Sequence, residues 1–334
     1  MTLGPKLYVL LGACAVAVAT PLVMSNPYTL SIIIVTMLYA YLALSWNVIG
    51  GIAGQLSLGH TAWFGIGAYT STVLFLNFGI SPWIGMLAGA ALSGIVAAVV
   101  GLPCFRLRGA YFALATIAAT MVLRIVVENT HEFLGGPRGL QVTLLHDAPL
   151  FFQHTRKEFY YAVALVLVVG ALWINHAIMR SRFGAYLAAI RNDQEAALAL
   201  GVDVQRYKLA AFVISAVMTA IGGTFYAQMV LFISPEKVFG VAMSVQIAVI
   251  CIIGGRGTLW GPILGAILLL VGEEAARRIT GGIVGADMLL YGLILMCVIM
   301  IEPRGVVAMI QRAASRALAP LSSPSGPQRS ESAQ

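Results

Sequence analysis

Apolar residues gather in ten runs that follow one another along almost the whole chain, separated by short polar segments. The runs lie at 7–19, 28–49, 56–78, 83–102, 111–127, 159–179, 209–232, 241–253, 259–271 and 286–301. Since about 20 apolar residues in a helix cross a bilayer, runs of this kind predict transmembrane helices. The pattern therefore indicates an all-α integral membrane protein, a polytopic bundle of about ten transmembrane helices with Gly-rich broken segments.

Two places leave the number of spans open. Residues 17–19 read Ala-Val-Ala, which resembles a signal-peptide cleavage site, although a retained first span is favoured. The runs 241–253 and 259–271 are each shorter than a full span and flank the Gly-Gly-Arg-Gly sequence at 254–257. They predict either two short helices that meet at the cytoplasmic face or one broken helix that dips in and out of the membrane.

Composition agrees with many spans. Of the 334 residues, 60% are hydrophobic and only 10% are charged, whereas soluble domains carry about a quarter charged residues. The net charge of +7 is scattered over short loops and forms no basic patch, so it fits the positive-inside rule rather than nucleic-acid binding. The four cysteines are far apart and imply neither a disulfide framework nor a metal site.

The positions of the basic residues also predict the orientation. Because loops rich in Lys and Arg stay in the cytoplasm, segment 180–208 is expected on that side, and segment 128–158, of mixed charge, on the other side. Both termini are then cytoplasmic. Residues 1–305 form the membrane domain, and residues 306–334 form a polar cytoplasmic tail that is expected to be disordered.

A polar island at 191–201 carries start and stop signals for a short helix. Asn192 is of a type that caps a helix, Glu195 stands three residues later, and Gly201 can end a helix in the left-handed conformation. The island also presents two carboxylates at the positive end of the helix dipole and one shared apolar face: Asp193 and Glu195, and Ala196, Ala197 and Leu200. A capped helix this short, outside the membrane, suggests a surface gripped by another protein, or an ordinary connector.

Glycine-rich stretches interrupt the apolar pattern at 50–68 and again at 254–265. Paired breaks of this kind in two halves of a chain are typical of a pathway at the middle of the membrane, because unwound backbone there can offer polar groups to a solute. The alternative is close helix packing without solute contact. The candidate pathway residues are Gly54, Gln55, Ser57, Gly59, His60, Thr61, Gly65, Gly254, Gly255 and Gly257.

Other functional classes find little support. His60 could relay protons, but a lone histidine among Gly, Ser and Thr is more often a hydrogen-bonded structural residue. The acidic residues sit in loops or at the ends of the predicted spans, which disfavours an ion-coupled secondary transporter working alone. No nucleophile elbow, metal-ligand spacing or Walker loop occurs, so no catalytic residues, cofactor or ATP site are predicted in the chain itself.

Several motifs resemble one family. Glu195-Ala196-Ala197 followed by Gly201 is similar to the loop by which bacterial ABC-importer permeases dock on their ATPases. Further blocks resemble branched-chain amino acid ABC permeases of the LivM type, and they occur in order at 54–60, 64–70, 106–114, 135–140, 181–184, 207–209, 233–236, 254–262 and 303–305. The chain departs from that pattern at Ala110, where an acidic residue is common, and at Arg256, where the family often has an apolar residue.

The resemblance implies a bacterial inner-membrane importer with several subunits. A second permease of the LivH type would complete the pathway, two cytoplasmic ATP-binding subunits would supply energy, and a periplasmic substrate-binding protein would deliver the solute. The expected solutes are branched-chain or other hydrophobic amino acids. Permeases of the same family for urea or short amides remain an alternative, because the fold does not fix the substrate.

Overall fold

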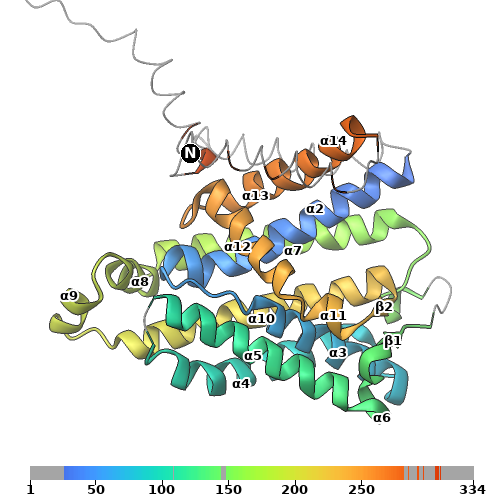
Figure 1. Ribbon diagram of the computed structural model, residues 1–334, viewed down its shortest axis with the longest axis horizontal. Helices are drawn as coiled ribbons and strands as arrows, with labels where there is room; N and C mark the ends of the chain where they lie inside the picture. The colour runs from blue at the N-terminus through green and yellow to red at the C-terminus, as the bar shows by residue number, and fades with distance from the viewer. Residues whose placement is uncertain are drawn as a thin grey trace, which may run out of the picture.

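The computed structural model describes residues 26–107, 109–143 and 148–281, together with the single positions 285, 292, 296, 305–307 and 309. It is a bundle of helices, drawn in Figure 1. The longer helices are α2 (Pro27–Trp46), α3 (His60–Phe78), α4 (Pro82–Cys104), α5 (Ala110–Asn129), α7 (Lys157–Arg180), α8 (Arg182–Asn192), α10 (Val204–Val230), α12 (Val241–Gly255) and α14 (Gly272–Ile279).

Short elements connect these helices. They are the π-helices η1 (Asn47–Ile52) and η4 (Ile267–Val271), the 3-10 turns η2 (Gly136–Arg138) and η3 (Pro149–Phe151), the short helices α6 (His131–Leu134), α9 (Gln194–Ala199), α11 (Pro235–Val238) and α13 (Gly261–Ala266), and the strands β1 (Leu140–Gln141) and β2 (Phe232–Ile233). The two strands pair antiparallel, with Leu140 opposite Ile233. This pairing fastens the segment predicted to lie outside the cytoplasm to the end of α10.

Six described helical segments are long and apolar enough to cross a membrane, which confirms the membrane-protein class. They are Pro27–Ile52, Pro82–Cys104, Ala110–Asn129, Lys157–Arg180, Val204–Val230 and Pro235–Gly255. The described residues do not include the run 7–19 or nearly all of the tail. Of the run 286–301, they include only positions 292 and 296. The count of ten spans therefore stays a prediction.

Small residues let the central helices α3, α4 and α10 approach one another closely. A side chain added at Gly67 or Gly223 would run into the carbonyl oxygens of Ala220 and Phe64 respectively. Across the same contact, the Thr224 hydroxyl donates a hydrogen bond of 3.0 Å to the Gly67 carbonyl oxygen. Glycine and threonine thus join α3 to α10 in the way that transmembrane helices commonly associate.

The outer helices expose apolar side chains instead. Only 28% of the apolar window of α5 and of α7 is buried inside the chain, against 72% for α2 and η1. Leu114 on α5 and Val166 and Trp173 on α7 are between 60% and 71% exposed. Apolar surface of this extent in a single chain fits contact with lipid or with other membrane helices.

The region 241–271 folds as two helical segments joined by a tight turn, an arrangement that both predicted alternatives share. Helix α12 ends at Gly255, a tight turn follows, and α13 begins at Gly261. The two helices pack side by side because Gly254 lies against the carbonyl of Gly261 and Gly265 lies against that of Ile250. The second helical run continues through η4 to Ile279, further than the apolar pattern predicted. Its extension is stabilised by i,i+4 ion pairs of Arg277 with Glu273 and of Arg278 with Glu274.

Candidate coupling segment and glycine junction

The predicted short helix exists as α9, but its N-cap is Asp193. The Asp193 carboxylate accepts hydrogen bonds from the backbone N–H groups of Glu195 (2.9 Å) and Ala196 (3.1 Å). The prediction of Asn192 as the cap was wrong, because Asn192 is the last residue of α8, a helix that the sequence analysis did not predict. The prediction for Gly201 is confirmed by its left-handed φ of 81°.

The predicted apolar face of α9 is divided in the structure. Ala197 is only 2% exposed and packs with Ile190 of α8 and Val204 of α10. Ala196 is exposed, and Leu200 is 84% exposed at the end of the helix. The proposal that Ala196, Ala197 and Leu200 share one outward face was therefore wrong, since the neighbouring helices of the same chain cover Ala197.

Helix α9 is held firmly to its neighbours. The buried Lys208 of α10 donates a hydrogen bond of 2.7 Å from Nζ to Oε1 of Gln194, the first residue of α9. Asp203 accepts a hydrogen bond from the backbone N–H of Arg206 (3.1 Å) and pairs with its guanidinium (2.8 Å), which fixes the start of α10. We call α8, α9 and the first two turns of α10 the bracket, because these contacts make them one unit.

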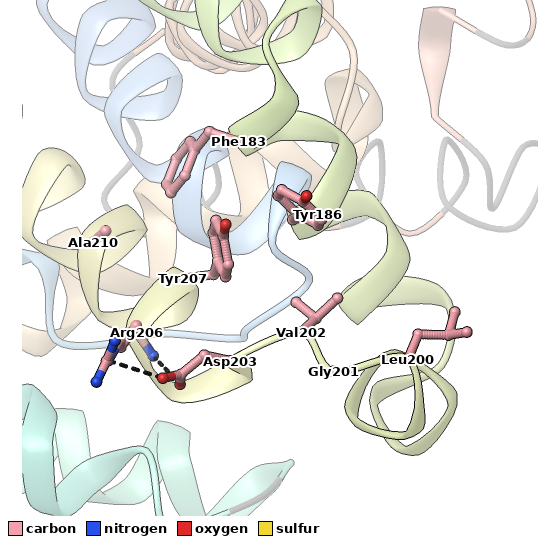
Figure 2. Close-up of a pocket in the computed structure, with 9 residues that line it drawn as sticks. All are labelled: Phe183, Tyr186, Leu200, Gly201, Val202, Asp203, Arg206, Tyr207 and Ala210. Carbon is pink, nitrogen blue, oxygen red and sulfur yellow. Dashed lines mark hydrogen bonds and ion pairs between the residues drawn. The ribbon is translucent and has the colours of Figure 1, made fainter.

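Two surface hollows adjoin the bracket. Figure 2 shows the first, of about 490 Å³, with the rings of Phe183, Tyr186 and Tyr207 gathered on one side and Leu200 on the other. The second, of about 460 Å³, is lined by Phe105, Arg106, Gln194, Leu198, Asp203, Val204 and Gln205. Asp203 lines both hollows, so the turn between α9 and α10 stands between them. At this end of the molecule, α9 and the turn that follows it therefore have a hollow on either side.

The two glycine breaks predicted from the sequence meet in the structure. The backbone N of Gly257 would lie 2.5 Å from a side chain added at Gly51. Asn47 joins the two segments, because its Oδ1 accepts from the Gly257 N–H (2.8 Å) and its Nδ2 donates to the Thr258 carbonyl (3.1 Å). The same Nδ2 donates to Oδ1 of Asn175 on α7 (3.1 Å). We call Asn47, Gly51, Gly54 and Gly257 the glycine junction.

His60 is fully buried in a cage of serine hydroxyls. Its Nε2 lies 2.7 Å from Ser215 Oγ, and its Nδ1 lies 3.2 Å from Ser57 Oγ. Because Ser215 already donates its hydroxyl hydrogen to the Ser45 carbonyl oxygen (2.7 Å), Nε2 must be the donor to Ser215, and Nδ1 then accepts from Ser57. The backbone N–H of His60 also donates to Ser244 Oγ (2.9 Å). This neutral, saturated histidine fits the structural alternative better than a proton relay.

The other candidate pathway residues do not gather in one place. Gly59 packs against the Thr116 backbone, Gly65 against the Phe239 ring, and Gly254 against Gly261. Three candidates remain. Gln55 is half-buried in the loop before α3, and Gly255 ends α12 with a φ of 125°. Thr61 is buried, and its hydroxyl has no hydrogen-bond partner among the described residues. Neither hollow includes a candidate pathway residue. Close packing accounts for these glycines, and a role in transport stays a prediction.

The site list drawn from the sequence omitted Arg191, Asn47, Asn175 and Lys208. Both asparagines lie inside apolar runs, and a polar side chain in such a run is a signal that it has a buried partner. Arg191 and Lys208 carried no comparable signal, because basic residues are ordinary in a cytoplasmic loop. Within the described residues, no group of three or more His, Cys, Asp or Glu side chains could hold a metal ion.

A helical bundle with six segments long and apolar enough to cross a membrane defines a polytopic membrane protein. The sequence matches the family described as "Branched-chain amino acid transport system / permease component" over residues 28–299, and the chain belongs to that family. It is 32% identical to the high-affinity branched-chain amino acid transport system permease protein LivM of Escherichia coli (strain K12), over 92% of this chain and 76% of that protein.

More distant relatives cover most of the chain as well. The nucleoside ABC transporter permease protein NupC of Lactococcus lactis is 27% identical over 76% of this chain and 84% of that protein. The permease protein LivH of Escherichia coli (strain K12) is 23% identical over 80% of this chain and 91% of that protein. No solved structure matches the chain. The chain is therefore related to both LivM and LivH, and more closely to LivM.

Proposed function

We propose that the chain is the LivM-type permease subunit of an ATP-driven importer for branched-chain amino acids, in the inner membrane of a bacterium. The observation that carries this proposal is the 32% identity to LivM over 92% of the chain, which includes the bracket. A LivH-type permease is the natural companion, because LivH is itself a relative. Two cytoplasmic ATP-binding subunits and a periplasmic binding protein complete the assembly.

In this proposal α9 is the coupling segment on which one ATP-binding subunit docks. Its capped start carries Asp193 and Glu195, and its exposed end carries Leu200. The hollows on either side give a partner room to enclose the segment. With ten spans, both termini and the bracket lie in the cytoplasm, and segment 128–158 lies in the periplasm. Residues 1–305 are then the permease domain, and residues 306–334 are the tail.

The solute route lies between this chain and its companion, and the glycine breaks border it. The small residues there allow the backbone to reposition at low steric cost. The exposed apolar faces of the outer helices offer surface for the companion as well as for lipid. The chain itself performs no ATP hydrolysis, and its work is to carry the solute and to respond to the ATP-binding subunits.

Reconstitution tests this function. The chain, a LivH-type permease and two ATP-binding subunits are placed in vesicles with the binding protein and radiolabelled leucine. We expect uptake that requires ATP and persists when proton and sodium gradients are collapsed. Uptake by the chain alone, driven by an ion gradient, would contradict the proposal. Competition with isoleucine, valine, a nucleoside, urea and acetamide distinguishes the expected solute from those of related permeases, and the nucleoside is included because of the relation to NupC.

A further inference from the structure

Arg191 connects the bracket to the glycine junction. It is the penultimate residue of α8, two residues before the Asp193 cap of α9. Its guanidinium Nη1 donates a hydrogen bond of 2.9 Å to the carbonyl oxygen of Gly51, which is 140 positions away in the sequence. One side chain therefore joins the segment that faces the ATP-binding subunit to the π-helix that ends the first described span.

Two glycines leave the space that this side chain occupies. A side chain added at Gly54 would come within 2.5 Å of Cγ of Arg191, and one added at Gly257 would come within 2.5 Å of its Nη1. Both glycines also adopt left-handed backbone conformations, with φ of 71° and 74°, which other residues rarely adopt. The stem of Arg191 thus lies along one glycine break, and its charged end lies against the other.

The bond to Gly51 also has an electrostatic reason. The carbonyls in the last turn of a helix lack partners within the helix, and the helix dipole places negative charge at that end. The run of α2 and η1 ends at Ile52, so Gly51 belongs to its last turn. A guanidinium is a suitable partner, since it is always charged and offers several N–H donors.

The junction spreads this contact to further helices. Gly257, which lies against Arg191, donates its backbone N–H to Asn47, and Asn47 donates in turn to Asn175 of α7. The thiol of Cys251 on α12 contacts the same Oδ1 of Asn47 at 3.4 Å. A displacement of the end of α8 would therefore act on α2, α7 and α12 together, through a short series of hydrogen bonds.

We propose that Arg191 is the positioning residue that transmits movement of the coupling segment to the glycine junction. The bracket keeps α9 and the end of α8 together because Ala197 packs on Ile190 of α8, and the bond from Lys208 to Gln194 holds α9 to α10. When an ATP-binding subunit moves α9, Arg191 moves with it and displaces the backbone at Gly51 and Gly257. This inference rests on the proposed function, because it requires a partner that moves α9.

Arg191→Met tests the inference, because it keeps an unbranched stem against Gly54 and removes the donor to Gly51. Arg182→Met is the matched control, since Arg182 is exposed at the other end of α8. In the reconstituted complex we expect the Arg191→Met chain to copurify with the ATP-binding subunits and to support their stimulation by loaded binding protein. The leucine transported for each ATP hydrolysed should fall about tenfold, as expected for loss of a charge-assisted hydrogen bond.

Two further measurements separate transmission from a merely structural role. Hydrogen exchange of the assembled wild type should change upon ATP addition at 194–199, 47–59 and 254–260. In Arg191→Met the response at 194–199 should remain, and the responses at 47–59 and 254–260 should be lost. Arg191→Lys, which keeps a cationic donor, should recover part of the transport.

Normal transport per ATP in Arg191→Met would overturn the inference. So would loss of the ATP-binding subunits from that variant, because Arg191 would then act in docking. A drop of equal size in Arg182→Met would also overturn it, since any charge on α8 would then suffice. Failure of the proposed function is distinguishable from these results, because the wild-type complex itself would then show no ATP-dependent uptake.

Discussion

Truncation of Leu200 to alanine separates docking from folding at the coupling segment. Leu200 is 84% exposed, so the change should alter the stability of the chain by less than about 0.5 kcal/mol. The change removes three carbon atoms, each of which contributes about 0.8 kcal/mol when it is buried. If an ATP-binding subunit buries Leu200 fully, the loss is about 2.4 kcal/mol, and the affinity falls roughly fiftyfold.

The measurement is a titration of purified ATP-binding subunits, fluorescently labelled, onto lipid nanodiscs that hold this chain and its companion permease. Leu150→Ala is the matched control, because Leu150 is 81% exposed and lies in the segment predicted to face the periplasm. We expect Leu200→Ala to weaken binding and Leu150→Ala to leave it unchanged, with equal thermal stability for both variants. Binding of Leu200→Ala within twofold of the wild type would show that docking does not bury this side chain.

Two further predictions concern packing and pH. Gly223→Ala should destabilise the chain by about 1–3 kcal/mol, because the new methyl group meets the Phe64 carbonyl. Gly170→Ala places its methyl group in open space and should stabilise α7 by up to about 1 kcal/mol. Equal thermal shifts of the two variants in detergent would contradict this prediction. On α14, outside the six spans, the hydrogen bond from Arg278 lowers the pKa of Glu274. The ionised Glu274 therefore stabilises the chain above the ordinary glutamate pKa of about 4.3, and this stabilisation is lost as the pH falls further. Thermal melts from pH 7 to 3 should show that loss in the wild type and not in Glu274→Gln.

The spanning helices could be predicted from the sequence because lipid imposes a simple rule on composition. The run 83–102 became Pro82–Cys104, and the run 159–179 became Lys157–Arg180. Helix α8 escaped prediction because it is too short to form a span and carries arginines near both ends, as a surface connector also does. The choice between Asn192 and Asp193 as cap depended on where that unpredicted helix ends.

The contacts of the site were beyond the sequence for a different reason. The role of Ala197 depends on Ile190 and Val204, which cover it only once α8 and α10 fold back on α9. The bond from Arg191 to Gly51 joins residues 140 positions apart, and no periodic pattern links two such positions. Sequence located the two glycine breaks, but it could not show that they meet, because their pairing depends on how the helices pack.

Helix α3 shows what a hydropathy pattern measures in a membrane protein. It is not among the six described segments apolar enough to count as spans, and yet His60, Trp63, Phe64 and Tyr69 on it are all buried. Helices α4 and α10 pack against it, so it is covered by protein of the same chain, whereas α5 and α7 expose much of their apolar surface. Low hydropathy is tolerated in such a helix because its glycines pack closely against neighbouring helices and His60 and Ser71 find hydrogen-bond partners inside the protein. A buried helix can be weakly apolar but need not be, since the segment of α2 and η1 is largely buried and strongly apolar. A weakly apolar run between strong ones therefore indicates an inner helix, which is where polar contacts specific to function can be made.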